Sequence, residues 1–286
     1  MKQILVISGK GGTGKTVLTA SFAVLAKNKI MVDCDVDAAD LYILLKPKIL
    51  ERNKFVGGKS AVIDESLCIK CGQCKTVCRF EAFDDNFNLD PISCEGCGFC
   101  SIICPVDAIK MSDNISGEWF ISETKYGDFV HAKLGIAEEN SGKLVAKIRD
   151  EAKKLAEAKK ADYVIIDGPP GIGCPVMASL AGIDLAVIIT EPTVSGIHDM
   201  QRVMELAKHF KITTKVVINK FDLNLENCEK VKSLCAENNI EILGLISFDS
   251  VVSKSIVVCM PLVEYTDGKV SQEIRNIWDK IICKIC

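Results

Sequence analysis

This sequence has little net charge, few histidines and no long apolar runs. Its 286 residues carry 35 Lys and Arg against 38 Asp and Glu, which gives a formal net charge of −3. Because there is no basic excess, we expect no binding to nucleic acid. No uninterrupted apolar run approaches the roughly 18–20 residues that a membrane span needs, and the chain starts directly with a predicted strand rather than a signal peptide. These absences argue against a membrane protein and favour a cytoplasmic one.

Cysteine, in contrast, is abundant. The chain has fifteen cysteines, and eight of them lie between Cys68 and Cys104. Disulfides are rare in a reducing cytoplasm, so this clustering favours metal binding over a disulfide scaffold. The three histidines are isolated along the chain and indicate no catalytic triad.

Short apolar runs alternate with longer amphipathic stretches. The apolar runs are continuous, which is typical of strands that are buried on both faces. They predict strands over residues 3–8, 30–33, 163–167, 185–190, 215–219 and 240–246, and the amphipathic stretches predict helices over 15–27, 141–160, 195–210, 226–238 and 270–285. This alternation predicts an α/β fold with a doubly wound, mostly parallel sheet.

One region interrupts the alternation. Residues 57–112 are rich in cysteine, loop-like and without long periodic elements, so we expect a small inserted domain there. Residues 1–56 and 113–286 would then form the main domain. Within them, residues 119–134 are typical of a β-hairpin that leads back to the main sheet.

A phosphate-binding motif follows the first predicted strand. Gly9-Lys10-Gly11-Gly12-Thr13-Gly14-Lys15-Thr16 fits the P-loop pattern G-x-x-x-x-G-K-[ST] between a strand and a helix. We expect the backbone N–H groups of Gly11, Gly12, Thr13 and Gly14 to surround a polyphosphate at the positive end of the helix. Lys15 would contact the β- and γ-phosphates, and the Thr16 hydroxyl would bind Mg²⁺.

The additional lysine in this loop carries a family resemblance. The sequence resembles the deviant Walker A ATPases of the MinD/ParA superfamily, which include the nitrogenase iron protein and have the pattern K-G-G-x-G-K-[ST]. The resemblance implies a nucleotide-sandwich dimer, either a homodimer or a heterodimer with a paralogue, in which Lys10 reaches the phosphates of the partner subunit. It also implies that Asp35 orients the attacking water, with Asp37 and Asp40 as weaker candidates, and that Asp167, at the end of an apolar strand, lies near Mg²⁺.

The base-recognition segment is open to two interpretations. Asn219-Lys220-Phe221-Asp222 fits N-K-x-D, the guanine-reading motif of GTPases, in which Asp222 would accept hydrogen bonds from the base. The family resemblance instead implies an adenine that is contacted by Asn219. Because that resemblance covers more of the chain, we favour ATP and keep GTP as the alternative.

The cysteines form two runs with the same spacing. Cys68-x₂-Cys71-x₂-Cys74-x₃-Cys78 is followed by Cys94-x₂-Cys97-x₂-Cys100-x₃-Cys104-Pro105, which is the pattern of two-cluster bacterial ferredoxins. The fourth cysteine of each run binds the cluster of the other run in that pattern. We therefore predict two 4Fe–4S clusters. One is bound by Cys68, Cys71, Cys74 and Cys104, and the other by Cys94, Cys97, Cys100 and Cys78. Zinc is the alternative, but paired C-x₂-C sites do not explain runs of this kind.

These motifs together predict a MinD-type P-loop ATPase with an inserted ferredoxin-like α+β domain. The leading hypothesis is that ATP hydrolysis drives electron transfer to an unidentified redox protein. The alternatives are an iron–sulfur assembly or carrier ATPase, which would serve a cluster-accepting protein, and a MinD-like positioning protein. Cys174 and the pair Cys283 and Cys286 remain without an assigned role.

Overall fold

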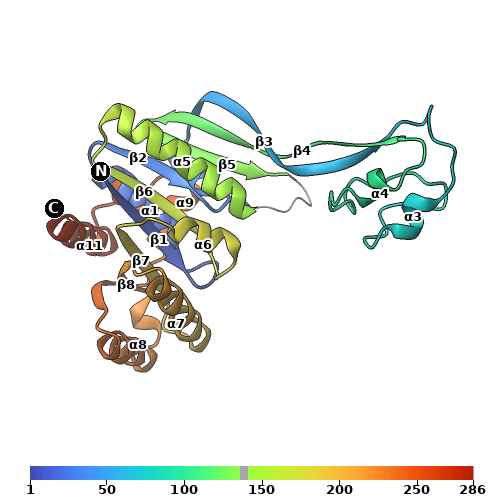
Figure 1. Cartoon of the computed structure of the whole chain (residues 1–286). Coiled ribbons are helices and arrows are strands. Elements are labelled where there is room, and N and C mark those ends of the chain that lie inside the picture. Colours follow the sequence, from blue (N-terminus) through green and yellow to red (C-terminus); the bar gives the residue numbers. More distant parts are fainter. Residues whose placement is uncertain (136–140, 286) are drawn as a thin grey trace. The chain divides into compact units, whose positions relative to one another are not determined.

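In the described residues, nine strands form one sheet in the order β3-β4-β5-β2-β6-β1-β7-β8-β9 (Figure 1). The structure is a computed structural model, and it describes residues 1–135 and 141–285. The pairs from β5 through β9 along this order are all parallel, which confirms the mostly parallel α/β sheet. The strands are β1 (Lys2–Ser8), β2 (Lys29–Asp33), β3 (Lys48–Ile63), β4 (Ile109–Thr124), β5 (Gly127–Leu134), β6 (Tyr163–Pro170), β7 (Leu185–Thr190), β8 (Thr213–Asn219) and β9 (Glu241–Ile246).

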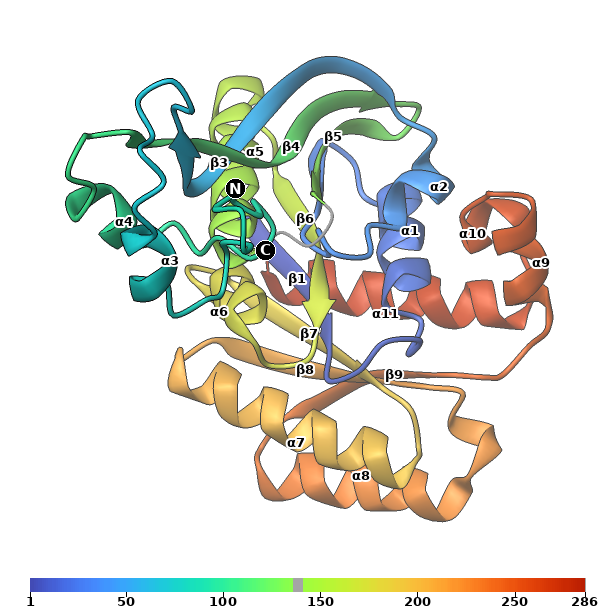
Figure 2. The same ribbon diagram turned by 90° about the vertical axis from the view of Figure 1, so that its right-hand side faces the viewer.

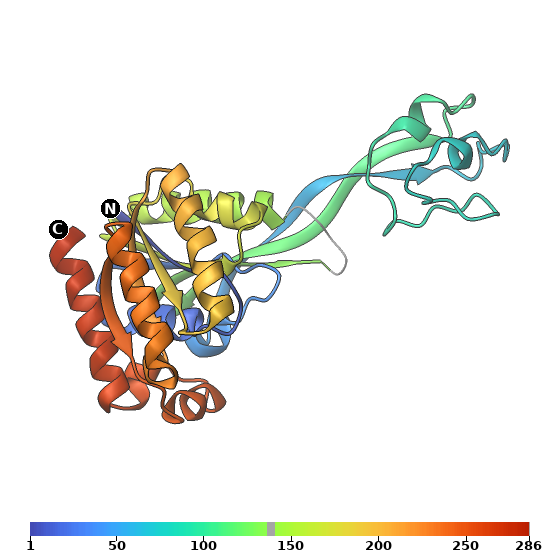
Figure 3. The ribbon, with the colours of Figure 1, turned by 90° about the horizontal axis from the view of Figure 1, so that it is seen from below.

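Helices cover both faces of this sheet, which is why its central strands are apolar throughout. The helices are α1 (Lys15–Leu25), α2 (Leu41–Leu45), α3 (Gln73–Val77), α4 (Phe99–Ile102), α5 (Ser141–Lys159), α6 (Cys174–Leu180), α7 (Val194–His209), α8 (Leu225–Glu237), α9 (Val251–Val257), α10 (Leu262–Tyr265) and α11 (Lys269–Ile285), with a 3₁₀ turn, η1 (Phe221–Leu223). Helices α1, α10 and α11 contact one another, and α7 and α8 lie side by side (Figures 2 and 3). Side chains from α1, α2, α10 and α11 share one hydrophobic core with the strands.

The last helix packs on the main sheet, as its apolar stripe predicts. Ile274, Ile277 and Ile281 are buried, and the Trp278 ring lies 5.0 Å from the ring of Phe22. Gly244 on β9 lies so close to Ile277 that a Cβ at this position would approach its side chain to 2.5 Å. No helix in the described part of the chain is long and apolar enough to cross a membrane.

The chain divides into two compact units, here called the main unit and the cysteine unit. The main unit contains Met1–Arg52, Trp119–Lys133 and the chain from Ser141 on, and the cysteine unit contains Asn53–Glu118 and a segment that begins at Leu134. The predicted boundaries at residues 57 and 112 fall inside β3 and β4. The division therefore lies within two continuous strands and not in flexible linkers.

The sequence does not indicate the long strands at the borders of the inserted region. Between Ile63 and Ile109 the structure has only the short helices α3 and α4 among its helices and strands, as expected, but β3 and β4 are each sixteen residues long and reach into residues 57–112 from both sides. Most side chains of β3 are exposed, so the strand has no apolar run to signal it. The pair Gly57-Gly58 also lowers its apparent strand propensity.

Candidate functional site

The carboxyl ends of the parallel strands meet at one edge of the sheet, and the P-loop follows β1 at this edge. Gly12 and Gly14 have φ angles of 76° and 90°, which side chains rarely adopt. The Oγ1 atom of Thr13 is buried and, among the described residues, has no hydrogen-bond partner. An orphaned hydroxyl in a loop of this shape fits a polar ligand such as a phosphate.

Lys15 lies between two carboxylates, one in the loop after β2 and one on β6. Its Nζ atom is 3.4 Å from Oδ2 of Asp35 and 3.3 Å from Oδ1 of Asp167, and its side chain is 7% exposed. Thr16 donates a hydrogen bond of 2.8 Å from Oγ1 to Oδ2 of Asp167. The structure therefore brings together four residues that the sequence placed at one site: Lys15, Thr16, Asp35 and Asp167.

The electrostatics of this site are set by burial and by the excess of carboxylates. Burial raises the pKa of Asp35, and the neighbouring Asp167 adds to that effect although Lys15 opposes it. Burial alone would lower the pKa of Lys15, but Asp167, Asp35 and Asp33 together outweigh it and raise the pKa. The hydroxyl of Thr16 and the carboxylates of Asp35 and Asp167 are oxygen donors of the kind that Mg²⁺ prefers.

A cavity of about 200 Å³ adjoins the P-loop and matches the predicted base-binding position. Gly12, Gly14, Asn219, Lys220 and Phe248 are among its lining residues. Asn219 donates a hydrogen bond of 2.8 Å from Nδ2 to the carbonyl of Thr13, and this bond connects the end of β8 to the P-loop. A Cβ at Gly14 would approach this Nδ2 atom to 2.4 Å, so this contact requires glycine.

Asp222 has a different position from the one that the guanine motif implies. It is not among the residues that line the cavity. Its Oδ1 atom accepts a hydrogen bond of 2.8 Å from the backbone N–H of Phe248, which does line it. Asp222 therefore holds the loop after β9, whereas Asn219 and Lys220 are the members of the motif that line the cavity.

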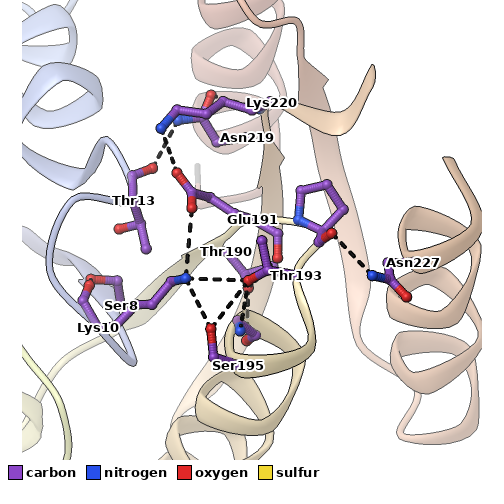
Figure 4. Close-up of polar contacts among 12 residues, drawn as sticks. Ser8, Lys10, Thr13, Thr190, Glu191, Thr193, Ser195, Asn219, Lys220 and Asn227 are labelled. Carbon is purple, nitrogen blue, oxygen red and sulfur yellow. Dashed lines mark hydrogen bonds and ion pairs between the residues drawn. The ribbon is translucent and has the colours of Figure 1, made fainter. Parts of the chain in front are cut away.

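Lys10 contacts its own chain (Figure 4). Its Nζ atom donates to the Thr193 and Ser195 hydroxyls, each at 3.2 Å, and lies 3.7 Å from Oε2 of Glu191. The other carboxylate oxygen of Glu191 is 2.6 Å from Nζ of Lys220. Glu191 is thus shared by two lysines beside the P-loop.

The cysteine unit contains two small cavities, and each is lined by four of the eight cysteines. Cys68, Cys71, Cys74 and Cys104 line the first cavity. Cys78, Cys94, Cys97 and Cys100 line the second. These are the two sets that the ferredoxin pattern predicts, with the fourth cysteine of each run at the other cavity. All cysteines in the described residues are free thiols, so none of the eight is used in a disulfide.

No set of three or more His, Cys, Asp or Glu side chains in the described residues converges on a point where a single metal ion could lie. A tetrahedral zinc ion needs such convergence, with sulfur atoms about 2.3 Å from one centre. Each thiolate of a 4Fe–4S cluster binds a different iron, so the four sulfur atoms surround a larger space. Four thiols at each cavity, drawn from both runs, are a donor set that fits a 4Fe–4S cluster.

The remaining cysteines do not join these sets. Cys174 is exposed at the first position of α6, and Cys283 is exposed on α11. Cys286 lies outside the described residues.

Sequence reasoning missed three residues near the P-loop, two at strand ends and one on α1. Thr19 is buried and donates a hydrogen bond of 3.0 Å to Oδ1 of Asp167, Asp33 is completely buried beside Asp167, and Glu191 contacts Lys10. Asp33 and Glu191 could have been noticed because each stands at or just after the carboxyl end of a strand. The position of Thr19, one helical turn after Lys15, depends on a contact with β6 that no local pattern shows.

Comparison with known proteins agrees with this geometry. The sequence matches the model of the CobQ/CobB/MinD/ParA nucleotide binding domain over residues 4–262. An uncharacterized protein of Methanocaldococcus jannaschii is 36% identical over 283 residues, which cover 98% of this chain and 96% of that protein. The iron-sulfur cluster carrier protein of the same organism is 29% identical over 137 residues, which cover 43% of this chain and 47% of the carrier.

Solved structures support the same fold. The septum site-determining protein MinD of Pyrococcus horikoshii, in complex with Mg-ADP, superimposes with a TM-score of 0.61 at 17% identity, covering 99% of this chain and 98% of that one. An identity this low shows the fold alone, but the family model covers most of the chain and includes the P-loop. The resemblance inferred from Lys10 and Lys15 is confirmed, and the chain belongs to the CobQ/CobB/MinD/ParA family of nucleotide-binding proteins.

Proposed function

We propose that this protein is an ATPase that holds two 4Fe–4S clusters and couples ATP hydrolysis to electron transfer toward a partner protein. The observation that carries the proposal is the division of the eight cysteines between two cavities. Three cysteines of each set are close together in sequence, whereas the fourth comes from the other run. In two-cluster ferredoxins the fourth cysteine of each run binds the other cluster in the same way.

The surroundings of the cysteines also fit such clusters. Cys74, Cys78, Cys94, Cys100 and Cys104 pack against a small apolar core of Ala61, Phe83 and Ile109. Burial raises the pKa of the Cys74 and Cys100 thiols, and neighbouring thiols add to the effect. Bound iron would reverse this preference because it deprotonates the thiols that coordinate it. When bound, the clusters would supply one-electron chemistry, and the exposed Cys71 and Cys97 leave each set of cysteines open to solvent on one side.

In the ATPase reaction, Lys15 would exchange its contacts with Asp35 and Asp167 for contacts with the phosphates. Thr16 and Asp167 would then be available to hold Mg²⁺, and Asp35 would orient the attacking water. Lys10 would leave Glu191 and reach the phosphates of a second copy, or of a paralogue, in a sandwich dimer. The cavity beside Asn219 would take adenine, because Asp222 is engaged with Phe248.

A chemical assay tests the proposal directly. Protein purified without oxygen should be brown and contain about eight irons and eight sulfides per chain. Stoichiometric zinc without iron would contradict the proposal. Asp35→Ala should abolish hydrolysis and preserve nucleotide binding, whereas Asp279→Ala, at an exposed position on α11, is the matched control and should hydrolyse ATP normally.

A second candidate function is cluster delivery, which the partial similarity to iron-sulfur cluster carrier proteins favours. A carrier must release its cluster, whereas four ligands from one chain would retain it. Incubation with an apo-ferredoxin and, in parallel, of the dithionite-reduced protein with an oxidised holo-ferredoxin separates the two candidates. Iron that moves to the apo-ferredoxin with ATP indicates delivery, whereas reduction of the holo-ferredoxin while the iron stays on this protein indicates the redox role.

A further inference from the structure

A closed series of polar contacts begins and ends on the P-loop (Figure 4). The Thr13 carbonyl accepts a hydrogen bond from Asn219, and Oδ1 of Asn219 accepts the N–H of Lys220. Lys220 pairs with Glu191, and Glu191 lies next to Lys10. This series, here called the Glu191 ring, connects the phosphate loop, the end of β8 and the end of β7.

The backbone around the ring is tightly constrained. A Cβ at Gly9 would approach Asp199 of α7 to 2.4 Å, so the start of the P-loop lies directly against this helix. A Cβ at Gly196 would approach the Glu191 carbonyl to 2.5 Å, and the Ser8 hydroxyl donates to the Lys10 carbonyl at 2.8 Å. Both ends of the Lys10–Glu191 contact are therefore fixed by close packing.

The two lysines compete for one carboxylate. The Glu191 side chain is 14% exposed, whereas those of Lys10 and Lys220 are 30% and 32% exposed. Lys220 lies more than an ångström closer to the carboxylate than Lys10 does, so it takes the larger share of its charge. The Lys10 ammonium has three hydrogens, and three acceptors face it: Glu191, Thr193 and Ser195.

We propose that Glu191 is a positioning residue that holds Lys10 on its own chain, and that Lys220 limits the strength of this hold by competing for the same carboxylate. The consequence for catalysis rests on the proposed function, in which Lys10 must reach a second subunit. Dimerisation then requires that Lys10 leaves Glu191, so the Lys10–Glu191 contact opposes dimerisation. The ring also connects Glu191 to Asn219 and Lys220, which line the base cavity.

The first experiment needs neither ATP hydrolysis nor a dimer. Nucleotide-free protein is treated briefly with an amine-acylating reagent, and modification of Lys10 is measured by mass spectrometry relative to the exposed Lys230. Glu191→Gln should increase the labelling of Lys10 by about two- to fivefold, the range expected for a partly exposed ion pair. Lys220→Gln should decrease it, because Glu191 is then left to Lys10 alone. Glu205→Gln, an exposed glutamate on α7, is the charge-matched control and should leave it unchanged.

A merely structural role predicts a different pattern. If the ring only stabilised the fold, Glu191→Gln and Lys220→Gln would both loosen it and would shift the labelling of Lys10 in the same direction. That result, or labelling that does not respond to Glu191→Gln, would overturn the inference. Circular dichroism and thermal unfolding of each variant show whether the fold is kept, and the opposite directions expected for the two variants cannot come from unfolding.

The second experiment measures the consequence for dimerisation. With a non-hydrolysable ATP analogue, Glu191→Gln should dimerise at an about two- to fivefold lower protein concentration than the wild type, as measured by analytical ultracentrifugation. If the labelling follows the prediction but no nucleotide-dependent dimer forms in the wild type, the ring is supported and the proposed trans role of Lys10 fails. If the wild type dimerises and Glu191→Gln does not lower the protein concentration required, the inference that Glu191 opposes dimerisation is overturned.

Discussion

Asp33 and Asp167 lie opposite each other on the adjacent parallel strands β2 and β6, and both side chains are almost completely buried. Burial and the neighbouring Asp167 hold the pKa of Asp33 well above its usual range. Asp33 also accepts hydrogen bonds from the backbone N–H groups of Asp35 and Leu41, at 3.1 and 3.2 Å. It therefore shapes the segment that carries Asp35.

The two P-loop lysines should differ in their effects. Lys15→Ala should abolish nucleotide binding and reduce hydrolysis by at least about 100-fold, because it removes the cation that faces the phosphates. Lys10→Ala should preserve binding and lose hydrolysis, since its target lies on a second subunit. Fluorescent nucleotide titration and phosphate release measure the two properties. Normal turnover by monomeric Lys10→Ala protein would rule out the sandwich dimer.

The crossed arrangement of the cysteines makes a specific prediction. Cys78→Ala should lose the cluster that is expected at Cys94, Cys97 and Cys100, although Cys78 belongs to the other run. In protein assembled without oxygen, those three cysteines should then react with an alkylating reagent while Cys68 and Cys104 stay protected.

Cys104→Ala is the matched variant and should give the converse pattern, and each variant should keep about four irons. Mass spectrometry of alkylated peptides provides the measurement. Exposure of the run that contains the mutation, in both variants, would indicate uncrossed binding and would disagree with the two cavities.

Asp222 should not decide the choice of purine. Asp222→Asn keeps an acceptor for the Phe248 N–H and weakens at most this one hydrogen bond. The affinities for ATP and GTP should therefore each change by less than about threefold. A guanine reader would behave differently, because the exchange of a carboxylate oxygen for an amide NH₂ favours xanthine over guanine. Competition binding with ATP, GTP and XTP distinguishes the cases, and a gain of XTP binding would support the GTPase alternative.

His131 should make stability depend on pH. Burial lowers its pKa to about 4, and its Nε2 atom lies 3.0 Å from the Ser122 hydroxyl between the rings of Phe120 and Phe129. An unfolded histidine has a pKa of about 6.5, so the unfolded chain takes up the proton first and stability falls as the pH is lowered from about 6.5 to about 4.

Between pH 7 and pH 4.5 this residue should cost up to about 2–3 kcal/mol of unfolding free energy. Urea unfolding of the wild type and of His131→Gln at both pH values provides the measurement. The variant should lose less stability than the wild type over this interval. An equal loss in the two proteins would mean that His131 does not titrate as its burial implies.

Much of the site could be predicted because its motifs are local. The P-loop and both cysteine runs are contiguous, so spacing alone indicated Lys15, Thr16 and the eight thiols. The central strands were equally visible, since burial on both faces leaves continuous apolar runs such as Ile4–Ile7. β3 lacks such a run, and the Glu191 ring joins residues that are more than 180 positions apart, from Lys10 to Lys220. Contacts of that kind depend on the order of the strands, which periodicity does not determine.

The central claim is that the nucleotide and the clusters are coupled. A ligand shifts an equilibrium only through a difference in its affinity for two states, and by reciprocity the reduction of the clusters must change nucleotide affinity by the same free energy. The most direct test is to measure the midpoint potentials of both clusters with ADP and with a non-hydrolysable ATP analogue. We expect the potentials to differ between the two nucleotides, with a tenfold affinity change corresponding to about 59 mV for one electron. Identical potentials with both nucleotides, in the presence and absence of a redox partner, would contradict it.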